Sequence, residues 1–262
     1  MREGPPDRMP DGASGGLASG NQAVPGARSG KPAVPESSHA MSHGEPGSHQ
    51  SHHAHRGMEG HHFDPVAFLS REAERLKRVE ASERVREMLA LVPEDGLVVD
   101  VGAGVGSFAL RLAERLPRGR VLAVDRQADM VEEINRRAKE AGILNLDTLT
   151  GNAGTLPIQE GGADLVLFSL VLHDIPDPRK ALREARRLLR RGGFTYLIEF
   201  VPGATDVGPP AEILFTPERV EGFLAEAGFA KIAREMGPGP FYRVTGQVPA
   251  GMPLGEPPGG DD

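Results

Sequence analysis

Apolar segments of strand length alternate with amphipathic, charged segments over residues 97–228 of this 262-residue chain. Short continuous apolar runs are typical of strands buried on both faces, whereas apolar residues at three- and four-residue steps are typical of helices. Alternating strands and helices favour a parallel sheet with helices on both faces, because each crossover between parallel strands needs a helix-length connection. We therefore predict an α/β fold on a doubly wound, mostly parallel sheet.

The sequence predicts seven strands, of which the last two are close enough along the chain to form an antiparallel hairpin. They are expected at 97–101, 120–125, 146–151, 163–172, 194–200, 229–236 and 241–247. Helices are expected at 107–116, 128–141, 177–190 and 216–228, with two more within 63–92, the second capped by Ser82. The predicted sheet is therefore seven-stranded, with a C-terminal antiparallel hairpin and N-terminal helices.

The two ends of the chain differ in composition from its centre. Residues 1–62 are rich in Gly, Pro, Ser and Ala and contain no isoleucine or aromatic residue. Such a segment buries too little apolar surface to offset the entropy of ordering it. We predict a disordered histidine-rich tail over 1–62, a folded domain over 63–247 and a disordered tail over 248–262.

Eight of the nine histidines lie in the N-terminal tail. Neutral imidazoles suit zinc, nickel and copper, so one interpretation is a weak metal site. The other is a solvated low-complexity tail, or sequence upstream of a true start at Met41 or Met58. We favour the second, because nothing else in the tail supplies fixed ligand geometry, and we expect no metal site. The eight are His39, His43, His49, His52, His53, His55, His61 and His62.

The composition argues against several classes of partner. The net charge of −7 is unlike the basic face of a general nucleic-acid binder, and two tyrosines with no tryptophan give no stacking platform. The lack of cysteine removes disulfides, thiolate metal sites and cysteine nucleophiles. No apolar run approaches the roughly 18 residues of a membrane span, and no secretory signal is recognisable. We expect a soluble cytoplasmic protein with no nucleic-acid or membrane partner.

Three glycines at every second position follow the first predicted strand, in the stretch VVDVGAGVGSF. Glycine is used where the backbone needs positive φ or where a ligand must approach it closely. In a doubly wound sheet this turn lies at the carboxyl ends of the strands, beside the free N–H groups of the next helix. Asp125 ends the second predicted strand, 19 residues after Gly106, where a carboxylate can hold both hydroxyls of a ribose. The two features together indicate a nucleoside-containing cofactor.

The dinucleotide pattern G-x-G-x-x-G would need glycine at position 107, where this chain has Ser107. The chain instead resembles the class I S-adenosylmethionine-dependent methyltransferases, over roughly residues 64–246. VVDVGAGVG is similar to the first motif of that family, AVDR to the second and GNAGTLPI to the third. The stretch from ADLVLFSLVLHDIPDP to FTYLIEF is similar to its fourth and fifth strands. Within the family, the chain is most similar to the ubiquinone and menaquinone C-methyltransferases.

This resemblance implies a Rossmann-like fold, S-adenosyl-L-methionine as the cofactor and methyl transfer to a small organic acceptor. By position, Asp100 would organise the amino group of the cofactor, Asp125 would hold the ribose hydroxyls, and Arg126 and Met130 would border the adenine. Asn152 stands where the family commonly has an aspartate, and its amide oxygen can still accept a hydrogen bond from the adenine amino group. The cofactor-binding residues implied are Asp100, Gly102, Ala103, Gly104, Gly106, Asp125, Arg126, Met130, Asn152, Ala153 and Ser169.

The same resemblance places the acceptor at the end of the fourth predicted strand, in the stretch LHDIPD. His173 is the candidate catalytic residue, as a base or as a group that orients the acceptor; the alternative is a strand-end histidine that satisfies backbone groups. Asp174 either orients His173 or faces solvent, and we favour solvent. Glu199 either borders the pocket or is structural.

The N-terminal helices would, by resemblance, cover the cofactor, with Phe63, Phe68 and Leu69 facing it; the alternative is that they only pack on the sheet edge. Two other functions stay open. A nicotinamide-dependent (NAD(P)) oxidoreductase shares this fold, but Ser107 and the lack of a Tyr-x-x-x-Lys pair argue against it. A non-enzymatic protein would hold the cofactor while the histidine tail senses or carries metal. The sequence does not name the acceptor, the methylated atom or the oligomeric state.

Overall fold

A computed structural model of the protein describes residues 62–204, 208–237 and 239–251. The predictions for the histidine-rich tail up to residue 61, and for residues 252–262, lie outside the described residues. His62 and Val248, which the sequence assigns to the two tails, are described. The His62 imidazole lies 3.0 Å from the Asp129 carboxylate, and Val248 is buried and exchanges backbone hydrogen bonds with Gly192 and Gly193.

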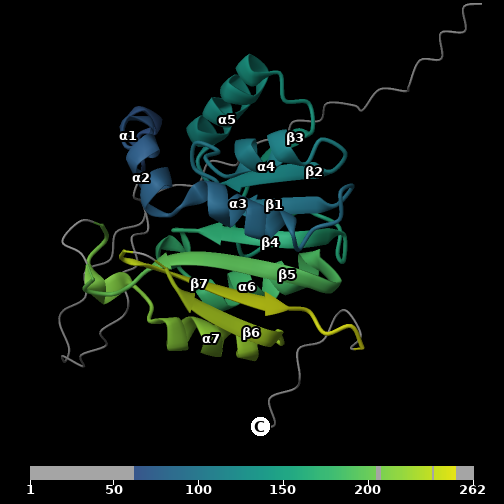
Figure 1. Ribbon diagram of the computed structural model, residues 1–262, viewed down its shortest axis with the longest axis vertical. Helices are drawn as coiled ribbons and strands as arrows, with labels where there is room; N and C mark the ends of the chain where they lie inside the picture. The colour runs from purple at the N-terminus through teal and green to yellow at the C-terminus, as the bar shows by residue number, and fades with distance from the viewer. Residues whose placement is uncertain (1–61, 205–207, 238, 252–262) are drawn as a thin grey trace, which may run out of the picture. The chain divides into compact units, whose positions relative to one another are not determined.

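Seven strands form one sheet in the order β3-β2-β1-β4-β5-β7-β6 (Figure 1). The first five run parallel, and β7 lies between β5 and β6, antiparallel to both. The predicted doubly wound, mostly parallel sheet with a C-terminal hairpin is confirmed. The strands are β1 (Leu97–Val101), β2 (Arg120–Asp125), β3 (Leu146–Thr150), β4 (Ala163–Ser169), β5 (Leu189–Phe200), β6 (Ala230–Met236) and β7 (Phe241–Gln247).

The helices follow the predicted pattern, with differences near the N-terminus. The first predicted helix is broken at Arg71, whose N–H closes a tight turn on Phe68. The next helix begins after Glu80, which takes a left-handed φ of 51°, so Ser82 is not its N-cap. None of the helices in the described residues is long and apolar enough to span a membrane. The helices are α1 (Pro65–Ser70), α2 (Glu72–Arg78), α3 (Ala81–Leu89), α4 (Ala109–Arg115), α5 (Ala128–Ala141), α6 (Pro178–Leu188) and α7 (Pro217–Glu226), with 3₁₀ turns η1 (Leu172–Asp174) and η2 (Ala211–Ile213).

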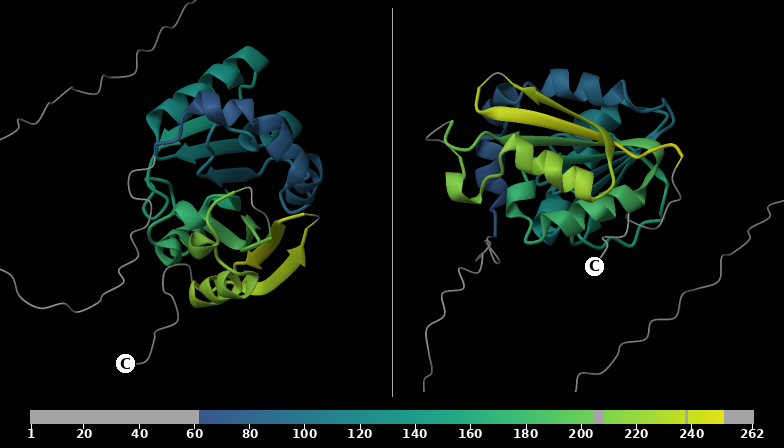
Figure 2. Two further views of the ribbon diagram at one scale, coloured as in Figure 1. Left: turned by 90° about the vertical axis from the view of Figure 1, so that its left-hand side faces the viewer. Right: turned by 90° about the horizontal axis from the view of Figure 1, so that it is seen from below.

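The central strands carry the core on both faces of the sheet, and helices cover both faces (Figure 2). In β4, Leu165 and Leu167 pack with residues of α3, α4 and α5, whereas Val166 and Phe168 pack with residues of α6 and α7. Burial on both faces explains why this strand reads as a continuous apolar run.

Two strands differ from the prediction by more than one residue. β4 ends at Ser169 rather than at residue 172, because Leu170 takes a left-handed φ of 55° and the η1 turn follows. β5 begins at Leu189 rather than at residue 194, so it runs directly on from α6. The early end of β4 brings the η1 turn to the carboxyl edge of the sheet.

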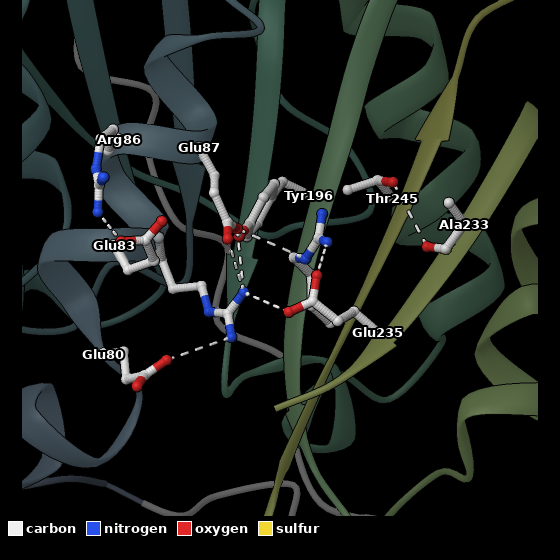
Figure 3. Close-up of polar contacts among 10 residues, drawn as sticks. Glu80, Glu83, Arg86, Glu87, Tyr196, Ala233, Glu235 and Thr245 are labelled. Atoms are coloured by element: carbon white, nitrogen blue, oxygen red, sulfur yellow. Dashed lines mark hydrogen bonds and ion pairs between the residues drawn. The ribbon is translucent and has the colours of Figure 1, made fainter. Parts of the chain in front are cut away.

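A polar network ties α3 to β5, β6 and β7 (Figure 3). The hydroxyl of Tyr196, a fully buried residue of β5, donates to Glu87 on α3. Glu87 also accepts hydrogen bonds of 3.1 Å from Arg84, which lies 3.5 Å from Glu235 on β6. Arg243 on β7 pairs with the same Glu235. Charged side chains therefore connect α3 to the C-terminal side of the sheet in addition to apolar contacts.

Candidate functional site

A cleft of about 180 Å³ opens at the carboxyl ends of β1, β2 and β4. The strand order reverses here, because β2 and β3 lie on one side of β1 and β4 lies on the other. Ligands of doubly wound sheets bind at such a switch point. The walls of the cleft come from the turn after β1, from the segments that follow β2, β3 and β4, and from α1 and α2.

The turn after β1 carries three glycines with positive φ. A Cβ atom on Gly102 would lie 2.3 Å from a methyl carbon of Val171, so a larger residue would collide with the segment after β4. Gly104 lines the cleft, and the nearest atom to a Cβ there would be 3.5 Å away, in the ring of Phe68. Gly106 packs against α5 behind the wall of the cleft. Gly102 therefore lets the segment after β4 pack against the turn, and Gly104 leaves the turn without a side chain on the cleft side.

Asp125 ends β2 with its carboxylate beside the glycine turn. Oδ2 accepts the N–H of Gly104 at 2.8 Å, and Oδ1 accepts that of Gln127 at 2.9 Å. These bonds fix the carboxylate plane and use two of its roughly four lone pairs. Because Asp125 lines the cleft, the other lone pairs can accept hydrogen bonds from a pair of ligand hydroxyls.

Asp100, in β1, lies buried at the base of the cleft. Its Oδ1 has no hydrogen-bond partner among the described residues. Burial, and then the charge of Asp125, raise the pKa of Asp100 to about 7, while the Ala109 N–H acts in the opposite direction. A cationic group in the cleft would satisfy the orphaned oxygen and favour the carboxylate.

The other residues that the resemblance implies surround these two carboxylates. Met130, in the first turn of α5, is buried, and the Oδ1 of Asn152 accepts the N–H of Gly154 at 2.9 Å, which orients its amide. The structure brings the implied cofactor-binding residues together around one cleft, with Gly106 set behind its wall. The remaining implied residues also line the cleft: Ala103, Arg126, Ala153 and Ser169.

Aromatic side chains from the N-terminal segment cover the cleft. Phe63 and Phe68 both line it, with ring centroids 5.5 Å apart in an edge-to-face arrangement, whereas Leu69 lies outside its wall. The Arg75 guanidinium stacks on Phe68, 4.3 Å from the ring centroid. The Gln127 side chain accepts the N–H of Phe63 and donates to its carbonyl, both at 2.9 Å. The N-terminal helices therefore contribute directly to the site.

Glu72 on α2 anchors this cover. Its carboxylate, 12% exposed, accepts hydrogen bonds from the Ser107 hydroxyl at 2.7 Å and from Arg137 of α5 at 2.9 and 3.1 Å. Arg137 also donates to the Val105 carbonyl at 2.7 Å, in the glycine turn. This anchor could not be predicted from the sequence, because Ser107 stands out there only as a residue in place of a glycine and no local pattern distinguishes Glu72 from Glu74.

The segment after β4 forms the far end of the cleft. The left-handed Leu170 turns the chain out of the sheet, and η1 follows. Asp174 lines the cleft, whereas the His173 side chain is 3% exposed and lies behind it, with Nδ1 2.8 Å from Oε2 of Glu199. Burial opposes the charged imidazolium, but the hydrogen bond and charge of Glu199, assisted by Asp174, outweigh burial and raise the pKa of His173. Among the described residues, no cluster of three or more acidic or histidine side chains could hold a metal ion.

Comparison with known proteins establishes the family. A family model described as a methyltransferase domain matches residues 99–197. The ubiquinone/menaquinone biosynthesis C-methyltransferase UbiE of Rhizobium meliloti (strain 1021) is 35% identical over 175 residues, covering 58% of this chain and 67% of that protein. The chain belongs to the class I S-adenosylmethionine-dependent methyltransferases. Within this methyltransferase family it falls in the UbiE-like branch, which confirms the family predicted from the motifs, and S-adenosylmethionine is the cofactor of the family.

Two further methyltransferases are similar over shorter stretches or in fold alone. The demethylmenaquinone methyltransferase of Lactococcus lactis subsp. lactis (strain IL1403) is 30% identical over 134 residues, 51% of each chain. The crystal structure of a SAM-dependent methyltransferase from Aquifex aeolicus matches with a TM-score of 0.65 at 24% identity, covering 71% of this chain and 100% of that one, which shows a shared fold. The chain spans only 27% to 51% of the length of the first four curated relatives.

Proposed function

We propose that this protein transfers the methyl group of S-adenosylmethionine to a small organic acceptor bound in the same cleft. The juxtaposition of Asp100 and Asp125 carries the proposal. One carboxylate has an orphaned buried oxygen, and the other has free lone pairs facing the cleft, on adjacent strands. The cationic amino group and the ribose diol of S-adenosylmethionine meet these two requirements together.

The residues of the chain would bind and orient the reactants. When bound, S-adenosylmethionine supplies a methyl carbon already activated by its positively charged sulfur. Asp100 would face the amino group, Asp125 the ribose, and Met130 with Asn152 the adenine. Phe68, above Gly104, would keep water from the reacting end. Holding the acceptor atom in line, about 3 Å from the methyl carbon, would supply much of the rate acceleration of methyl transfer through proximity and orientation.

The acceptor that fits best is a small ring of quinol or phenol type. Apolar side chains from α2 and from the segment after β4 line the end of the cleft, among them Leu76, Val79, Leu170, Val171 and Ile175. Apolar walls with few polar groups are typical of small-molecule sites. The names of the relatives from R. meliloti and L. lactis, both of which refer to quinones, support the same class. The cytoplasmic location and the lack of a nucleic-acid partner stay predictions.

Calorimetric titration of the full chain with S-adenosylmethionine tests the proposal, with NADH as the parallel ligand. We expect saturable binding of S-adenosylmethionine alone. Asp125→Ala removes hydrogen bonds to a charged acceptor, so it should weaken binding by about 10- to 100-fold. Asp147→Ala is the matched control, because Asp147 forms an exposed surface pair with Arg120.

Two results would contradict the proposal. Binding of NADH and not of S-adenosylmethionine would favour the nicotinamide-dependent oxidoreductase over the methyltransferase. Equal loss of affinity in Asp125→Ala and Asp147→Ala would show that the cofactor does not bind beside the glycine turn.

A further inference from the structure

The far end of the cleft carries an acidic side chain with a buried imidazole behind it. Asp174 lines the cleft with 19% of its side chain exposed, whereas the His173 side chain is 3% exposed. From the sequence, His173 is the candidate catalytic residue with a structural strand-end histidine as the alternative, and Asp174 is expected to face solvent; the structure instead places Asp174 on the cleft wall. The group able to touch an acceptor here is therefore the carboxylate.

His173 lies between two carboxylates. Its Nδ1 is 2.8 and 3.0 Å from the two oxygens of Glu199, and its Nε2 is 3.5 Å from Oδ2 of Asp174. A neutral imidazole has one N–H, whereas an imidazolium presents an N–H on each nitrogen and suits an acceptor on both sides. The geometry therefore favours a charged ring between Glu199 and Asp174.

Glu199 is itself a fixed part of the scaffold. Its side chain is 1% exposed, and its Oε1 accepts the N–H of Leu172 at 3.1 Å, which ties the η1 turn to β5. A buried carboxylate needs a charged or strongly hydrogen-bonding partner, and His173 supplies one. Pairing with Glu199 alone would explain a buried His173, but not a second carboxylate placed between the ring and the cleft.

Backbone strain marks the same place. Leu170 holds a φ of 55°, which is costly for a bulky residue, and its N–H donates to the Ile198 carbonyl at 2.8 Å. Strained residues persist where the surrounding structure enforces them, and they cluster at functional sites. This bend takes the chain from β4 into η1, where the His173 side chain lies behind the cleft wall and Asp174 lies on it.

We propose that Asp174 receives the hydroxyl proton of the acceptor, and that His173, held by Glu199, is a positioning residue that keeps Asp174 ionised and directed into the cleft. This inference rests on the proposed function and requires that the acceptor carry an ionisable hydroxyl group.

The step balances without a further reactant. The O–H bond of the acceptor breaks, its proton passes to the Asp174 carboxylate, and its electron pair stays with the acceptor. That acceptor forms a new bond to the methyl carbon, from its oxygen or from a ring carbon made electron-rich by the oxyanion. The electron pair of the broken C–S bond stays on sulfur, and the product is S-adenosylhomocysteine. Asp174 then releases its proton to water; after attack by a ring carbon, the proton on that carbon also leaves to water.

The charged groups that face His173 come from two elements, and a third element contributes a titratable group beside Glu199. Glu199 faces it from β5 and Asp174 from η1. Tyr242 on β7 lies near Glu199; burial and the charge of Glu199 raise the pKa of Tyr242, so it stays neutral. Its hydroxyl donates to the Phe215 carbonyl at 2.7 Å. The imidazolium therefore has anionic neighbours on two sides, and the Phe200 ring lies edge-to-face against it with the centroids 6.0 Å apart.

Two probes that differ by one proton donor test the role of Asp174. The full chain is saturated with S-adenosylhomocysteine and titrated with 2-naphthol and with 2-methoxynaphthalene, following fluorescence. We expect the wild type to bind 2-naphthol about 10-fold or more tightly than the methyl ether, since a hydrogen bond to a charged acceptor is worth that much. Asp174→Ala should abolish this preference without changing the affinity for S-adenosylhomocysteine or for the ether. Asp147→Ala should keep it.

A wild type without the preference, or an Asp174→Ala variant that retains it, overturns the inference. These failures are separate from failure of the proposed function, which would appear earlier as absence of S-adenosylhomocysteine binding.

The pH profile of the same preference tests His173. Without the imidazolium, the Asp174 carboxylate loses a neighbouring positive charge that favours its ionised form. We therefore expect His173→Gln to lose the 2-naphthol preference at a higher pH than the wild type as the pH is lowered, and to keep it at pH 8. Glu199→Gln should shift the profile in the same direction. An unchanged midpoint in a folded His173→Gln variant would show that His173 is only structural.

Discussion

Asp100 carries a buried carboxyl group whose charge is not compensated within the described chain. Burial and then the neighbouring charge of Asp125 disfavour ionisation and raise the pKa of Asp100 to about 7, and its Oδ1 has no hydrogen-bond partner among the described residues. A cationic ligand acts in the opposite sense, because it interacts with the charged form only. Cofactor binding and deprotonation of Asp100 are therefore linked.

This linkage predicts the pH dependence of cofactor affinity. Below pH 7 Asp100 is increasingly protonated in the free protein, so binding must release a proton and the affinity should fall, by up to about tenfold per pH unit. The range from pH 5 to 7 is informative because the amino group of the cofactor stays charged there. Calorimetric titrations in two buffers of different ionisation enthalpy should show release of nearly one proton at pH 6 and of about half a proton at pH 7.

Asp100→Asn is the variant that isolates the effect. It should bind the cofactor more weakly at pH 8 and lose most of the proton release at pH 6. Equal proton release in Asp100→Asn and in the wild type would assign the titration to another group.

At the scale of elements, α2 is held to the rest of the site by one acidic residue. Glu72 is tied to the start of α4 by its hydrogen bond from Ser107, two residues before that helix, and to α5 by Arg137. Because α2 has only seven residues, it has little helical stability of its own. The position of the N-terminal helices over the cleft therefore depends on this contact and on the clasp between Gln127 and Phe63.

Glu72→Ala should loosen the cover while leaving the sheet folded. Amide hydrogen exchange over residues 65–79 is expected to be faster by about 10-fold or more, since hydrogen bonds to a charged group are lost, and the cofactor should dissociate faster. Glu74→Ala is the matched control on the same helix, because the Glu74 side chain is 69% exposed and pairs with Arg78 only at the surface. Similar exchange rates in the two variants would refute the anchoring role.

The elements could be predicted from the sequence to the extent that local patterns determine them. The strands β1, β2 and β7 lie where their apolar runs and flanking turns place them, and the family motifs locate the glycine turn and Asp125. The end of β4 could not be predicted, because nothing in a run of apolar residues marks Leu170 for a left-handed conformation. The anchor at Glu72 and the burial of His173 against Glu199 depend on contacts between residues 35 and 26 positions apart, which no local pattern contains.

At the scale of the whole sheet, the network around Glu87 joins α3 to the last strands of the sheet. Tyr196 donates to Glu87 from a fully buried position, and burial followed by the neighbouring Glu87 raises its pKa, so it remains a neutral donor. Removal of its hydroxyl would leave Glu87 with the contacts to Arg84 and Arg243. The loss would affect the global stability because α3, β5 and β6 all take part in the network.

Tyr196→Phe should lower the free energy of unfolding by about 1.5–3 kcal/mol, the worth of a hydrogen bond to a charged group. Urea unfolding followed by circular dichroism measures it, with an unchanged m-value expected. Thr245→Val on β7 is the control, because the Thr245 hydroxyl makes only a 3.5 Å contact with the Ala233 carbonyl (Figure 3). A smaller loss in Tyr196→Phe than in Thr245→Val would show that the network contributes little to stability.

The place of β7 in the sheet has a consequence for biosynthesis. It is the last strand of the described chain, yet it lies inside the sheet, paired with β5 on one side and β6 on the other. While the ribosome is still translating, β5 presents an open edge, and β6 has no neighbour to pair with. Nascent chains that stall before residue 241 therefore expose a template for intermolecular strand pairing and become substrates for chaperones and proteases.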